Sequence, residues 1–87
     1  MKAEALLQHA AAVVRDCRRL YGEPIDLFDH VAKRWSLILG TEVTPLQAML
    51  WLIDLKGVRL THDSQHLDSI TDIAGYAVVL AEVLDDA

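Results

Sequence analysis

Twice along this chain, a glycine that can end a helix is followed within five residues by a proline that can begin the next one. Gly22 precedes Pro24, and Gly40 precedes Pro45. Glycine readily adopts the left-handed conformation that closes many helices, and proline suits the first helical turn, where its missing N–H would have no partner. Thr44 adds a capping hydroxyl directly before Pro45. These signals predict helices separated by short loops.

Apolar residues recur at helical spacing between these breaks. We expect helices over about residues 3–20, 24–39 and 45–59, and a fourth that begins between Asp63 and Leu67 and ends near Leu84. The 45–59 segment is apolar nearly all round, which is typical of a helix that is central or shared with a partner chain. The pattern predicts a single all-α domain over residues 1–87, a compact four-helix arrangement with short loops.

The apolar stripe of the last helix, Gly75 and Cys17 each lead to a further prediction. The predicted apolar stripe of the last helix consists of Leu67, Ile70, Ala74, Ala77, Ala81 and Leu84, and it is widened by Ile73, Val79, Leu80 and Val83. Gly75 lies inside that helix, where it costs roughly 1 kcal/mol relative to alanine, so we expect another helix to cross closely there. Cys17 falls on the apolar face of the first helix, and we expect a packed thiol. A single cysteine excludes an intrachain disulfide and fits a reducing, cytoplasmic setting.

The amino-acid composition limits the kinds of partner that we expect for this chain. At 87 residues the core is small, yet 53% of the chain is hydrophobic, which favours a homo-oligomer whose subunits cover one another's apolar residues. No apolar run is long enough to span a bilayer, so we expect no membrane association. A net charge of −5 opposes general nucleic-acid binding, which needs a basic surface.

Ionisable residues gather where the last two predicted helices meet. Lys56 and Arg59 share one helical face because they are three residues apart. Asp68, Asp72 and Tyr76, spaced by four, share a face of the next helix. An antiparallel pair of helices would bring these faces together, with His66 and Ser69 beside the turn and the helix start offering backbone N–H groups to an anion.

Three interpretations of this corner stay open. The first is a structural lock, in which Lys56 or Arg59 pairs with Asp68 or Asp72. The second is an anion site, in which the basic residues Lys56 and Arg59, together with His66 and the helix amides, hold a phosphate. The aspartates would then align these two basic side chains or contact ribose. The third is a Mg²⁺ site formed by Asp68 and Asp72. Tyr21 or Tyr76 would serve as a stacking platform for a base.

The order of residues resembles a small family of phage and prophage proteins that is known as a domain of unknown function and is loosely labelled MazG-like. The matching residues are Arg18, Tyr21, Gly22, Pro24, Trp35, Ser36, Leu39, Gly40, Lys56, Arg59, His66, Asp68, Ser69, Asp72, Gly75, Tyr76 and Ala77. The resemblance covers about three quarters of the chain. It implies an all-α fold and a nucleotide-like ligand.

The MazG enzymes are Mg²⁺-dependent nucleoside triphosphate pyrophosphohydrolases that bind the metal through an E-x-x-E pair and a later E-x-x-D pair. This chain has no E-x-x-E, and of its two E-x-x-D pairs, Glu23 to Asp26 straddles Pro24 and Glu82 to Asp85 lies near the end of the last predicted helix. We therefore expect binding rather than hydrolysis and no cofactor. The leading hypothesis is an oligomeric phage protein that sequesters a nucleotide second messenger of host antiviral defence. The alternatives are a Mg²⁺-dependent MazG-like pyrophosphohydrolase and an inhibitor that binds a host enzyme.

Overall fold

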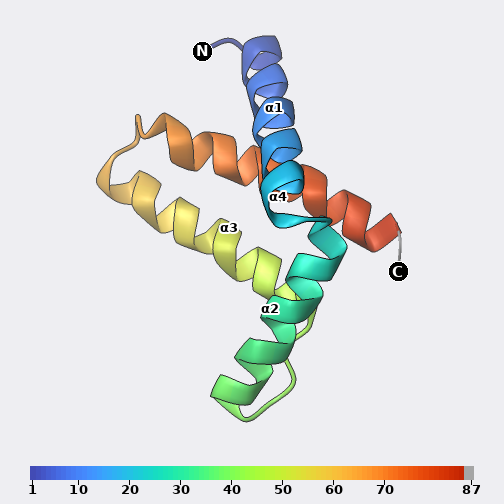
Figure 1. The fold of residues 1–87 in the computed structure, drawn as a ribbon. Coiled ribbons are helices and arrows are strands. Elements are labelled where there is room, and N and C mark those ends of the chain that lie inside the picture. Colours follow the sequence, from blue (N-terminus) through green and yellow to red (C-terminus); the bar gives the residue numbers. More distant parts are fainter. Residues whose placement is uncertain (86–87) are drawn as a thin grey trace.

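The computed structural model describes residues 1–85, and within that range the chain forms four α-helices and no strand (Figure 1). They are α1 (Ala3–Tyr21), α2 (Pro24–Leu39), α3 (Pro45–His62) and α4 (Leu67–Asp85). The predicted all-α, four-helix class is confirmed, and the helix starts agree closely with the sequence signals. The third helix runs three residues further than expected, to His62 rather than residue 59. Whether the chain forms an oligomer stays a prediction.

The glycine and proline signals act as expected at the helix ends. Gly22 and Gly40 have positive φ angles of 88° and 70°, which glycine adopts without a side-chain clash. Thr44 forms a reciprocal capping box with Gln47: the Gln47 N–H donates to the Thr44 hydroxyl at 3.2 Å, and the Thr44 N–H donates to Gln47 Oε1 at 2.9 Å. Pairing these otherwise free N–H groups fixes where α3 begins.

Helix α4 is the central element, because it packs against α1, α2 and α3 (Figure 1). The α3 and α4 helices lie side by side and run in opposite directions, whereas α1 crosses α4. The predicted crossing by another helix at Gly75 is found, since Val14 of α1 lies there. The crossing does not require glycine, because a methyl group at Gly75 would lie 3.6 Å from Val14 Cγ2, an ordinary contact. The segment 45–59, expected to be central or shared with a partner chain, packs against α2 and α4 and buries Ala48 and Met49, and its sharing with a partner chain stays a prediction.

The buried core is small and sits where α2, α3 and α4 meet. Its cluster comprises Phe28, Met49, Val79 and Val83. The predicted buried stripe of the last helix is only partly right. Leu67, Ala77, Ala81 and Leu84 are exposed, whereas Val79 and Val83, which were expected to widen the stripe, are buried. The buried residues of α4 are Ser69, Thr71, Gly75, Val79 and Val83. The buried face is shifted from the predicted stripe because α1 packs against α4 at Gly75.

The prediction of a packed Cys17 is also wrong, because the thiol is exposed. Helix α1 buries only Ala10 fully, and Cys17 lies one turn beyond Val14, where α1 no longer meets the core. Among the described residues, no helix combines the length and apolar character that crossing a membrane requires.

We expect Gly75→Ala to stabilise the protein by up to about 1 kcal/mol, because the helix interior favours alanine and the added methyl makes an ordinary contact with Val14. Chemical denaturation monitored by far-UV circular dichroism measures the change. The matched control is Gly40→Ala, where a side chain at φ 70° should cost about 1–2 kcal/mol. A loss of stability in both variants would contradict the packing at Gly75.

Candidate functional site

A cavity of about 330 Å³ opens between the C-terminal half of α1, the start of α2 and the middle of α4. Its walls are mostly apolar, with Val13, Val14, Leu27, Phe28 and Val79 among the lining residues. The cavity lies where the last turns of α1, the start of α2 and the middle of α4 meet, and their side chains leave this space unfilled. An apolar cavity with a few polar groups is the usual form of a small-molecule site.

Thr71 contributes a polar group to this wall that the protein leaves without a partner. The residue is 3% exposed, lines the cavity, and its hydroxyl oxygen makes no hydrogen bond. A buried hydroxyl without a hydrogen bond costs about 1–3 kcal/mol. A ligand that reached this hydroxyl and formed a hydrogen bond with it would remove that cost.

Asp72 links the cavity to the charged corner at the junction of α3 and α4. Its carboxylate lines the cavity, and Oδ2 lies 2.9 Å from Nζ of Lys56. The Lys56 side chain is only 13% exposed. Leu52, one helical turn before Lys56 on α3, lines the same cavity. The predicted approach of Lys56 and Asp72 is therefore confirmed, and the pair lies at the cavity wall.

Tyr76 lies between the cavity and the two basic residues of α3, Lys56 and Arg59. Its ring lines the cavity and meets Phe28 edge to face, with centroids 6.3 Å apart. Burial raises the pKa of the Tyr76 phenol above its ordinary value, and the charges of Asp72 and Cys17 raise it further, while Lys56 and Arg59 act in the opposite direction. The phenol is therefore a neutral hydrogen-bonding group at physiological pH.

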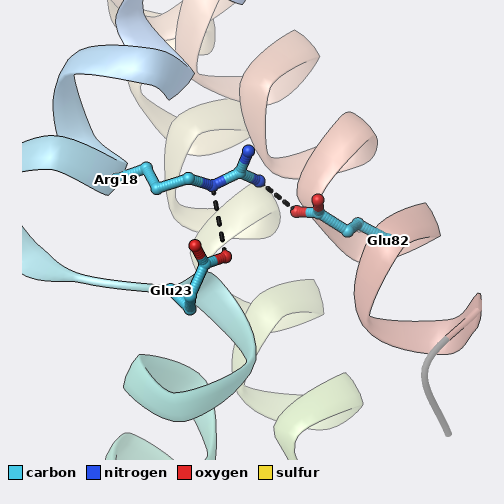
Figure 2. Close-up of polar contacts among 3 residues, drawn as sticks. All are labelled: Arg18, Glu23 and Glu82. Carbon is cyan, nitrogen blue, oxygen red and sulfur yellow. Dashed lines mark hydrogen bonds and ion pairs between the residues drawn. The ribbon is translucent and has the colours of Figure 1, made fainter.

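Arg18 closes the opposite side of the cavity and joins the ends of three helices (Figure 2). Figure 2 shows its guanidinium between Glu23, at the start of α2, and Glu82 of α4. Nε lies 3.3 Å from Glu23 Oε2, and Nη2 donates a hydrogen bond to Glu82. Arg18 and Glu82 are 64 residues apart in the sequence, so Arg18 links distant segments that form the walls of the cavity.

The remaining predicted site residues do not line the cavity: Arg59 lies in the last turn of α3, and His66, Asp68 and Ser69 lie at or just before the start of α4. Ser69 is fully buried, and its hydroxyl lies 2.7 Å from His66 Nδ1. The Ser69 N–H donates to the same Nδ1 at 3.3 Å, so His66 caps α4 and presents Nε2 outward. Asp68 is exposed in the first turn. Over residues 1–85, no three His, Cys, Asp or Glu side chains gather in a way that could hold a metal ion.

Asp72, Tyr76 and Tyr21, which the sequence suggested as site residues, all line the cavity, and their role in binding a ligand stays a prediction. Sequence reasoning missed Thr71, Arg18 and Cys17, which line the same cavity. No local pattern marks these residues, because they meet only when α1 crosses α4. The one available signal was the position of Thr71 and Asp72 one turn before the mid-helix glycine, Gly75.

The raised pKa of Tyr76 predicts a specific loss of stability in alkali. Because the folded state favours the neutral phenol, its contribution is complete below the unfolded pKa and is lost as pH rises through the folded pKa. In a Tyr21→Phe variant, Tyr76 is the sole tyrosine, and its phenolate absorbance should appear with a midpoint above about 10. A midpoint at or below that value would contradict the burial of the phenol.

Comparisons with known proteins place the chain among phage proteins. It is 28% identical over 85 residues to the Gene 55 protein of Mycobacterium phage D29 and 34% identical over 64 residues to that of Mycobacterium phage L5. These alignments cover 97% and 72% of this chain but 56% and 41% of the relatives, so the chain spans about half of their length. No solved structure matches it significantly. The looser likeness to MazG enzymes stays a prediction. The family model described as a domain of unknown function (DUF6378) matches residues 5–84, and the chain belongs to that family.

Proposed function

We propose that the protein binds a phosphate-bearing nucleotide whose base enters the cavity between α1, α2 and α4 and whose phosphate lies toward Lys56 and Arg59. The observation that carries the proposal is the hydroxyl of Thr71, which is buried and unpaired in the wall of an apolar cavity. A folded protein keeps such a group at a cost to its stability, and a ligand that pairs with it accounts for that cost.

The size and lining of the cavity suit a nucleobase. Its volume of about 330 Å³ is at the lower end of the roughly 300–1,000 Å³ found for small-molecule sites, which favours a mononucleotide over a cyclic trinucleotide. Tyr21, Phe28 and Tyr76 supply aromatic surfaces, against which a flat base can stack or pack edge to face. The Asp72 carboxylate is an acceptor that suits a ring N–H or an exocyclic amine.

The phosphate would be held outside the cavity by the basic residues of α3, Lys56 and Arg59. Arg59 is exposed and forms no ion pair within the described part of the chain, and it is close enough to Tyr76 to affect its pKa. A guanidinium can bind phosphate through two parallel hydrogen bonds. His66 would add an Nε2–H donor. Ser69 is left out of the ligand set, because it is fully buried and contacts His66.

The biological role that we propose is sequestration of a nucleotide signal. A phage protein that binds such a molecule without converting it would lower the free concentration of a second messenger of host antiviral defence. The E-x-x-E pair of the MazG enzymes does not occur in this sequence, which supports binding over hydrolysis. The proposal predicts that the bound nucleotide is recovered intact.

The test is a thermal-shift titration with nucleoside triphosphates, deoxynucleoside triphosphates, cyclic dinucleotides and ADP-ribose derivatives, with and without Mg²⁺. A ligand of the native state raises the melting temperature by mass action. Cys17, the sole cysteine, is exposed and lines the cavity, so a nucleotide bound there should slow its alkylation by iodoacetamide. A Lys56→Met/Arg59→Ala variant should lose the shift, while Lys33→Met/Arg15→Ala, with the same charge change, should keep it.

The outcomes separate the alternatives. A shift with intact ligand and protected Cys17 supports the proposal. A shift that requires Mg²⁺ and yields pyrophosphate would replace it with the pyrophosphohydrolase. A shift without protection of Cys17 would place the ligand elsewhere. No shift with any nucleotide would overturn nucleotide binding and leave the Lys56–Asp72 pair as a structural contact.

Thr71→Val should have opposite effects on stability and on binding. Replacing the unpaired hydroxyl with a methyl group of similar size should raise stability by about 1 kcal/mol, or roughly 4–8 °C in melting temperature for a domain of this size. The same change should weaken the best nucleotide about tenfold, since one hydrogen bond is lost. Isothermal titration calorimetry measures the affinity. Thr41→Val, in an exposed loop, is the control and should change neither quantity.

A further inference from the structure

The C-terminal half of α2 and the outer side of α3 present an apolar surface that this chain does not cover. The surface consists of Trp35, Ile38 and Leu39 of α2 and Trp51, Leu55 and Val58 of α3, called here the tryptophan face. Ile38 is 76% exposed, Leu39 56% and Val58 51%. At its centre the rings of Trp35 and Trp51 stack with centroids 6.0 Å apart. Figure 1 shows that this end of α2 projects away from α1 and α4.

We propose that the tryptophan face is the interface of a two-fold symmetric homodimer of this chain. Large contiguous apolar patches on soluble domains usually mark interaction sites. Trp35, Ile38 and Leu39 also line a hollow of about 250 Å³, which is a socket for an apolar side chain of the partner. Stacked tryptophans at the centre of such a surface match the aromatic anchors that dominate binding energy in interfaces.

The charged residues on the tryptophan face indicate that the molecule that covers this face is a second copy of the chain. Arg34 directly precedes Trp35, and Asp54 lies one helical turn after Trp51. Both are exposed, and neither forms an ion pair within residues 1–85. In a two-fold interface, a contact from one residue to a second on the partner is repeated in reverse. An axis through the tryptophan stack would bring each Arg34 to the Asp54 of the other copy.

The small core supports the same conclusion. In the described residues, the core cluster has four buried members, Phe28, Met49, Val79 and Val83, with Val14, Leu52, Tyr76 and Leu80 only partly buried against it. The radius of gyration is 13.7 Å, against about 12 Å for a compact domain of this length. An open arrangement with so few buried apolar residues gains stability when a partner covers its exposed ones. The tryptophan face lies away from the cavity between α1, α2 and α4, so this proposal does not depend on nucleotide binding.

The first experiment measures mass in solution by size-exclusion chromatography with light scattering. The wild-type chain, whose monomer mass is 9.7 kDa, should elute at twice that mass. Ile38→Glu places a charge in the interface and should give a folded monomer, with unchanged far-UV circular dichroism. Leu20→Glu, at a residue of α1 that is 64% exposed, is the matched control and should remain a dimer. A monomeric wild-type chain, or a dimer that survives Ile38→Glu, would overturn the proposal.

A charge exchange tests whether two identical faces meet. Arg34→Glu and Asp54→Arg should each raise the dimer dissociation constant at least about tenfold, because each places like charges opposite one another. The double variant Arg34→Glu/Asp54→Arg restores complementarity and should recover the wild-type constant in sedimentation equilibrium. A double variant weaker than both single variants would show that these residues do not face each other across a two-fold axis.

Discussion

The contact of the Val79 and Val83 stripe of α4 with Phe28 of α2 and Met49 of α3 holds the rest of the structure in place. These residues form the core cluster, and α4 is the element that carries each of the other helices. Helix α1 has a weaker attachment, since its only fully buried residue is Ala10. Its position depends on the crossing at Gly75 and on the ion pairs of Arg18 with Glu23 and Glu82.

This uneven packing explains why a cavity can exist in so small a domain. A chain of this size has little apolar surface to bury, and a filled space beside Gly75 and Thr71 would have stabilised it further. The cavity instead contains a threonine hydroxyl without a partner and lies beside an ion pair whose lysine is largely covered. The unpaired hydroxyl lowers the stability of the fold, and the partly buried ion pair contributes little to it. Local features that do not stabilise a fold are expected where the structure is adapted to binding.

The sequence allowed the helices and their ends to be predicted, because each end is set by a local signal such as Gly22, Gly40 or the Thr44–Gln47 capping box. It also allowed the approach of Lys56 and Asp72 to be predicted, since a short connection forces α3 and α4 to run antiparallel. It indicated Gly75, Val79 and Val83 of α4 but not the buried Ser69 and Thr71. The buried face depends on where α1 crosses, and the contact of Val14 with Gly75 joins residues far apart in the chain. The same limit hid Thr71, Arg18 and Cys17.

The long sequence separation between α1 and its contacts on α4 has a consequence for the order of folding. The pairs α2–α3 and α3–α4 are neighbours in the chain, whereas Arg18 and Glu82 are separated by 64 residues, so closing the loop between them costs more conformational entropy. We infer that α1 docks last and opens first, as a unit less protected from hydrogen exchange than α4. Because α1 supplies one wall of the cavity, the site exists only while α1 is docked. Docking of α1 and occupancy of the cavity are therefore thermodynamically linked, so that a ligand in the cavity would hold α1 in its docked position.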